Sequence, residues 1–82
     1  MVWFFTRGDD IVQVKTRFDK ATQAYVLDIQ WPNRPAEIEK FLDRTAFAAR
    51  LANLEAELEE GAWMRRGGPE ISKDAWLGPI NH

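Results

Sequence analysis

The sequence predicts an α+β domain: a four-stranded antiparallel β-meander packed on one C-terminal α-helix, followed by an irregular tail. Three observations predict this fold. Residues 10–18 and 23–31 alternate between apolar and polar side chains, residues 44–60 repeat apolar side chains at helical spacing, and residues 61–82 contain glycine and proline breaks. We therefore place the domain at residues 1–62 and a tail, docked on the domain, at residues 63–82.

The first two strands form a predicted hairpin. Residues 2–7 are mostly β-branched or aromatic, which favours a strand. Gly8 and Asp9 fit a two-residue type II′ turn, because glycine tolerates a positive φ at the first central position. Residues 10–18 alternate again, so Arg7 should pair with the first residue after the turn.

The third and fourth predicted strands complete the meander. Residues 23–31 alternate after a turn at residues 19–22, and we expect Phe18 to pair with Gln23. A fourth strand over residues 36–42 follows a proline-rich turn. The predicted core face of the sheet consists of Trp3, Phe5, Val12, Val14, Tyr25, Leu27, Ile29 and Ile38. This assignment leaves Phe41 facing outward unless the strand contains a bulge.

A break at Asp43 separates the fourth strand from the helix. A single helix over residues 35–60 would carry apolar stripes on two opposite sides, which is unusual in a small domain. With Asp43 as N-cap, a helix over residues 44–60 has one stripe, and Phe47 stands at the position of a hydrophobic staple with Leu42. The stripe consists of Phe47, Leu51, Leu54 and Leu58. Gly61 suits the stop. An unbroken helix starting at Pro35 is the alternative.

Composition favours a small protein of a reducing compartment. The 82 residues make one domain, and the chain contains no cysteine for disulfides or thiolate chemistry. No apolar run has the length of a membrane span, and the first residues lack a basic segment of the kind found in signal peptides. We expect a cytoplasmic protein with no membrane partner.

The sequence gives little support to an enzyme. The one histidine, His82, is the last residue, and the one serine, Ser72, has no base placed to activate it. Phosphate-binding, dinucleotide-binding and metalloprotease motifs are absent from the sequence. We expect no catalytic activity, no cofactor and no metal.

The second face of the sheet is the predicted interaction surface. It should carry an apolar strip that one helix cannot cover, and large tail residues could cover it or bind a partner. The candidate residues are Val2, Phe4, Ile11, Val26, Trp63, Trp76 and Leu77. The sequence therefore predicts a small protein-interaction or accessory domain, whose partner is an unidentified protein or a second copy in a homodimer.

A nucleic-acid-binding sheet face is the alternative function. Arg7, Lys15 and Arg17 lie near Phe4 on the first two predicted strands, and such a basic and aromatic surface could contact phosphates. However, Asp28 on the neighbouring strand would repel phosphates, and the net charge of the chain is −2. Nucleic acid is therefore the less favoured partner.

Overall fold

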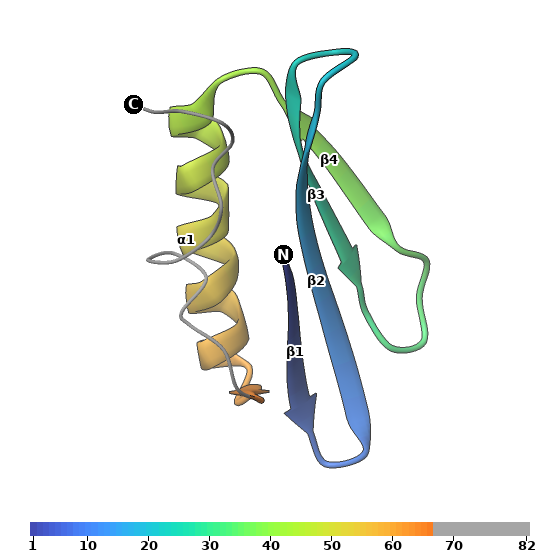
Figure 1. Cartoon of the computed structure of the whole chain (residues 1–82). Helices are drawn as coiled ribbons and strands as arrows, with labels where there is room; N and C mark the ends of the chain where they lie inside the picture. The colour runs from blue at the N-terminus through green and yellow to red at the C-terminus, as the bar shows by residue number, and fades with distance from the viewer. Residues whose placement is uncertain (67–82) are drawn as a thin grey trace.

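A computed structural model describes residues 1–66, which form one antiparallel sheet and one helix (Figure 1). The elements in chain order are β1 (Val2–Arg7), β2 (Asp10–Asp19), β3 (Ala24–Gln30), β4 (Glu37–Phe41), α1 (Arg44–Glu60) and β5 (Met64–Arg65). The strand order in the sheet is β4-β3-β2-β1-β5. The predicted α+β meander is confirmed, and the short β5 extends it beside β1.

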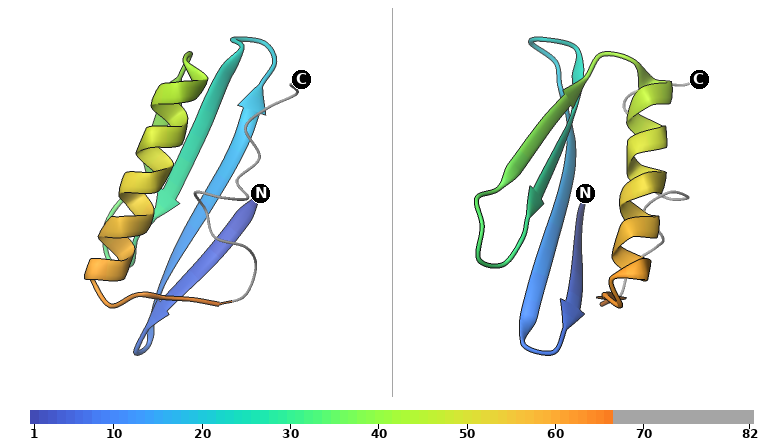
Figure 2. Two further views of the ribbon diagram at one scale, coloured as in Figure 1. Left: turned by 90° about the vertical axis from the view of Figure 1, so that its left-hand side faces the viewer. Right: turned by 180° about the vertical axis from the view of Figure 1, so that it is seen from behind.

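The core lies between the sheet and α1, which runs along one face only (Figures 1 and 2). The buried cluster consists of Trp3, Phe5, Val12, Val14, Leu27, Ile29, Phe47, Leu51, Leu54, Leu58 and Trp63. Alternation in β2 and β3, together with the predicted register of β1 against β2, therefore predicted the inward side chains of these strands correctly. The predicted stripe on α1 is buried as a whole.

The first hairpin has the predicted register. Arg7 pairs with Asp10, and Phe5 pairs with Val12. Gly8 has a φ of 61°, the positive value that the first central position of a type II′ turn requires. The turn thus sets the register that brings the apolar side chains of both strands to one face.

The second hairpin differs from the prediction by two residues. Phe18 pairs with Tyr25, not with Gln23, because the four-residue turn spans residues 20–23 instead of residues 19–22. The carboxylate of Asp19 holds this turn by accepting hydrogen bonds from the hydroxyl of Thr22 (2.9 Å) and the amide of Ala21 (3.0 Å). These bonds lower the pKa of Asp19. A shift of two residues leaves every side chain on its predicted face.

The faces of β4 are opposite to the prediction. Ile38 pairs with Asp28, so it points away from α1 and is 61% exposed, whereas Phe41 packs against the core. No bulge interrupts the ladder between Glu37 and Phe41. Two contacts with α1 favour this orientation. The centre of the Phe41 ring lies 5.7 Å from that of the Phe47 ring, and Glu39 forms a salt bridge with Arg50.

That arginine, Arg50, ties α1 to the edge strand. Its guanidinium donates two hydrogen bonds to the carboxylate of Glu39, at 2.9 and 3.2 Å. The hydrogen bonds to Glu39 raise the pKa of Arg50. A bidentate pair of this kind fixes the orientation of the helix relative to β4.

Both ends of α1 depend on specific residues. The Asp43 carboxylate accepts a hydrogen bond from the Thr45 amide (3.2 Å), which confirms the predicted N-cap and excludes a helix from Pro35. The predicted staple is wrong, because Leu42 is 79% exposed. Gly61 has a φ of −82°; a Cβ there would lie 3.0 Å from Trp63.

Within residues 1–66, no helix is long and apolar enough to cross a bilayer.

Replacing the N-cap should weaken the domain measurably. Asp43→Ala removes the acceptor for the Thr45 amide, and we expect the free energy of unfolding to fall by about 1 kcal/mol. Urea denaturation measures the change. Asp43→Ser keeps a capping oxygen and should lose less, so equal losses from both variants would contradict the capping role.

The structure continues past the predicted boundary at residue 62. Trp63 is 9% exposed and belongs to the core, although it was assigned to the tail. Met64 pairs with Thr6, and the Arg66 amide donates to the carbonyl oxygen of Phe4 (2.9 Å). The remaining predicted anchors, Trp76 and Leu77, lie outside the described residues.

Candidate interaction surface

The face of the sheet that α1 does not cover carries several exposed apolar side chains. We call it the open face. Five large apolar residues on it are from 45% to 65% exposed: Val2, Phe4, Ile11, Ile38 and Met64. Because they come from β1, β2, β4 and β5, the apolar character extends across the sheet. Soluble monomers rarely leave a large patch of this kind exposed to water.

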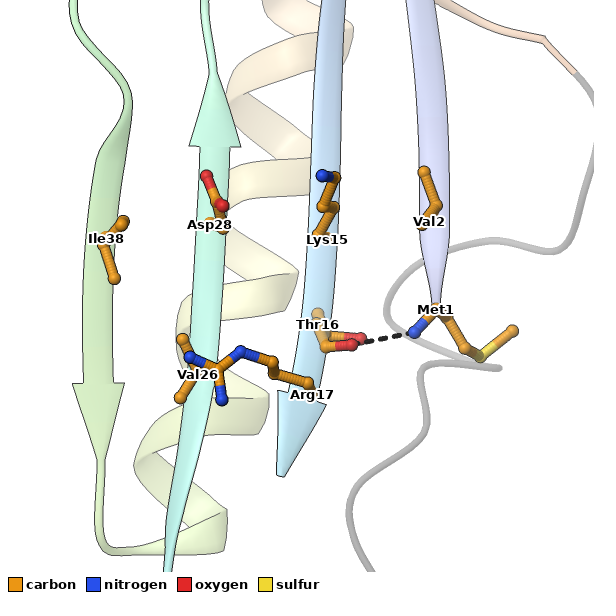
Figure 3. A pocket seen from close by; sticks show the side chains of 8 residues that line it. All are labelled: Met1, Val2, Lys15, Thr16, Arg17, Val26, Asp28 and Ile38. Atoms are coloured by element: carbon orange, nitrogen blue, oxygen red, sulfur yellow. Dashed lines mark hydrogen bonds between the residues drawn. The ribbon is translucent and has the colours of Figure 1, made fainter. Parts of the chain in front are cut away.

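One row of side chains crosses the open face from edge to edge. Val2 pairs with Lys15, Lys15 with Asp28, and Asp28 with Ile38. Figure 3 shows these four side chains side by side on β1, β2, β3 and β4. The row therefore has an apolar residue at each end and two opposite charges at its centre.

In the neighbouring row of the open face, the side chain of Arg17 covers Val26. Val26 pairs with Arg17, whose side chain reaches toward Val26 in Figure 3, and Val26 is only 2% exposed. The amino group of Met1 donates to the carbonyl oxygen of Thr16 (2.8 Å) and extends the ladder of β1 by one residue. Val26 therefore packs beneath Arg17 and has almost no exposed surface for a partner to contact.

A shallow pocket lies between these two rows (Figure 3). Its volume is about 170 Å³, and its lining consists of Met1, Val2, Lys15, Thr16, Arg17, Val26, Asp28 and Ile38. One carboxylate oxygen of Asp28, Oδ1, is buried there and has no hydrogen-bond partner among the described residues. A buried acceptor without a donor costs free energy, so the carboxylate of Asp28 is an unfavourable element of this face in the free chain.

The predicted surface residues within the described part of the chain divide into two groups, and Trp76 and Leu77 lie outside that part. Val2, Phe4 and Ile11 lie exposed on the open face, as predicted. Val26 and Trp63 are too buried to contact a partner. Sequence reasoning missed Ile38 and Met64. The first was placed on the wrong face, and the second becomes part of the sheet only because β5 pairs with β1.

The predicted nucleic-acid contacts do not form one surface. Lys15 and Arg17 lie on the open face, but Arg7 lies on the side of α1. The guanidinium of Arg7 donates to the Gly61 carbonyl oxygen (2.8 Å) and lies 4.3 Å from the centre of the Trp63 ring. Only two cations therefore remain on the open face from this set, beside the carboxylate of Asp28.

Comparisons with known proteins supply no template for this surface. The chain matches no model of a known protein family, no curated protein and no solved structure. Within residues 1–66, no three histidine, aspartate or glutamate side chains come close enough to hold a metal ion together. A function must therefore be inferred from the chemistry of the open face.

Proposed function

We propose that this chain is a cytoplasmic, non-catalytic protein-interaction module that binds a second copy of itself through the open face. The observation that carries the proposal is the central row of the open face, in which Lys15 and Asp28 stand side by side and the Oδ1 atom of Asp28 lacks a donor among the described residues. A partner surface that supplies a cation at Asp28 and an anion at Lys15 is complementary to this row. The row itself is such a surface.

Symmetry makes the row complementary to itself. Consider a two-fold axis that runs along the strands, midway between β2 and β3, between two stacked sheets. A half turn about this axis places Lys15 over Asp28 of the second copy, and Asp28 over its Lys15. The same rotation places Val2 over Ile38 of the second copy. Charges would then meet opposite charges, and apolar ends would meet apolar ends.

The energetics favour this arrangement over an exposed sheet. Burying the five exposed apolar residues of the open face would release about 25 cal/mol for each Å² of apolar surface removed from water. The ammonium group of a facing Lys15 would form an ion pair with the carboxylate of Asp28. The paired charges would mainly select the register of the two copies, because charge complementarity supplies specificity more than affinity.

A charge-reversal experiment tests the proposal. Lys15→Asp places a second carboxylate against Asp28 of the facing copy, and Asp28→Lys places two ammonium groups together. Each variant alone should therefore dimerise at least about tenfold more weakly than the natural chain. An equimolar mixture of the two variants should recover the dimer, since each copy now faces an opposite charge at both contacts. Sedimentation over a range of concentrations measures all three states.

The mixture separates contact between copies from effects within one copy. Lys20→Asp makes the same change of charge in the exposed turn after β2 and should leave dimerisation unchanged. A natural chain that stays monomeric, or a mixture that dimerises no better than its components, would contradict the proposal. Salt-sensitive binding of the monomer to DNA would instead favour the nucleic-acid alternative.

A further inference from the structure

A second pocket lies where the end of β1, the loop after β3 and the last turns of α1 meet. Its volume is about 370 Å³, and its lining consists of Arg7, Trp31, Pro32, Arg34, Glu57 and Trp63. We infer that this pocket binds an oxyanion, the carboxylate or phosphate group of a small molecule. The inference is independent of the open face, because the pocket shares no lining residue with it.

Two tryptophans hold the arginines of this pocket in place. The guanidinium carbon of Arg7 lies 4.3 Å from the centre of the Trp63 ring, and that of Arg34 lies 4.4 Å from the centre of the Trp31 ring. A guanidinium over an aromatic ring keeps the N–H groups at its edge available, and this edge matches the two oxygens of a carboxylate or phosphate. The arginines are thus partly ordered before any ligand arrives.

The pocket has more hydrogen-bond donors than acceptors. Arg7 uses one N–H group on the Gly61 carbonyl oxygen, whereas Arg34 makes no hydrogen bond to the described residues. The indole Nε1 of Trp31 is buried and also lacks a partner among them. Buried indole N–H groups normally find an acceptor. A bound oxyanion would supply acceptors to both arginines and would lie beside Trp31, which lines the pocket.

The charge and size of the pocket fit the same ligand. Two cations face one carboxylate, and that carboxylate, Glu57, is shared with Arg50 at 3.9 Å. The remaining positive charge favours an anion. A volume of about 370 Å³ is within the range of pockets that take small molecules. The ligand is therefore a small anion and not a polymer lying along the surface.

Nuclear magnetic resonance of the tryptophan indole groups tests the site directly. The full chain, labelled with ¹⁵N, is titrated with inorganic phosphate and separately with acetate, against sodium chloride of matched ionic strength. Trp31→Phe identifies the signal of Trp31 among the four indole N–H signals. We expect that signal to shift saturably with phosphate or acetate and not with chloride. The better of the two probes identifies the preferred oxyanion.

Substitution of Arg34 decides whether the response belongs to the pocket. Arg34 is exposed and lies in a loop, so Arg34→Gln should fold normally and weaken binding by about tenfold or more. Arg44→Gln removes an exposed arginine at the start of α1 and should bind like the natural chain. A response that does not saturate, that chloride reproduces, or that Arg34→Gln leaves unchanged would overturn the inference.

Discussion

Replacing Phe47 with alanine should lower the free energy of unfolding by about 3–5 kcal/mol. The side chain of Phe47 is fully buried at the start of α1. Its ring stacks on that of Tyr25, with centres 5.1 Å apart, and contacts that of Phe41 at 5.7 Å. The cavity left by alanine would thus separate the helix from β3 and β4 together. Small domains are stable by only about 5–15 kcal/mol, so the expected loss is a large fraction of the total.

Urea denaturation of the full chain measures this loss, and Leu42 provides the matched control. Leu42 and Phe47 are the two residues of the staple predicted from the sequence, yet Leu42 is 79% exposed. Leu42→Ala should therefore change stability by less than about 0.5 kcal/mol. Similar losses from both variants would mean that the staple forms in solution and that the packing of Phe47 described above is wrong.

The helix was predictable because several local signals agree on its limits. Asp43 provides a cap, the apolar stripe from Phe47 to Leu58 has one phase, and Gly61 follows the last helical residue. The inward faces of β1, β2 and β3 were predictable for a similar reason. Alternation alone assigns a face, and an error of two residues in register, as at the turn after Asp19, changes no face.

The orientation of β4 was not predictable from local signals. A strand that contains both Ile38 and Phe41 has one apolar residue of each parity, so alternation cannot decide which faces the core. Tertiary contacts decide it: Phe41 meets Phe47, and Glu39 meets Arg50. The same contacts place Ile38 on the open face, where it completes the row that we propose as the centre of a dimer interface.

The candidate surface was therefore only partly visible in the sequence. Alternation in the second strand and the predicted register of the first hairpin located Val2, Phe4 and Ile11 correctly. The unpartnered oxygen of Asp28 could not be predicted, because it depends on how neighbouring side chains exclude water. The separation of Arg7 from Lys15 and Arg17 follows from the parity of the strands, which the predicted register of the first hairpin already contained.

Trp63 belongs to the buried core, although it lies outside the domain bounds that the sequence predicts. It follows a predicted helix stop and precedes a tail with glycine and proline breaks, which is typical of irregular structure. In the structure the chain turns back at Ala62, whose φ is 64°, and this turn brings the Trp63 ring close to Gly61 and under Arg7. The absence of a side chain at Gly61 makes room for the ring.

Trp63→Ala should accordingly lower the free energy of unfolding by about 3–5 kcal/mol. The substitution removes a ring that is 9% exposed and packed in the core, and it deprives Arg7 of its aromatic partner. A residue in an undocked tail would instead change stability by less than about 0.5 kcal/mol. Because the two expectations differ severalfold, urea denaturation of the full chain distinguishes them.

Met64 is the matched control, because it is the next residue in the chain and lies 65% exposed on the open face. Met64→Ala should cost less than about 0.5 kcal/mol in a monomer, whereas Trp63→Phe should keep much of the burial and lose less than Trp63→Ala. If Trp63→Ala and Met64→Ala are equally mild, the domain ends at residue 62 as the sequence suggested. If only Trp63→Ala is severe, the connection from α1 to β5 is part of the core. The burial of Trp63 then also holds Met64 and Arg65 beside β1, where they form the fifth strand.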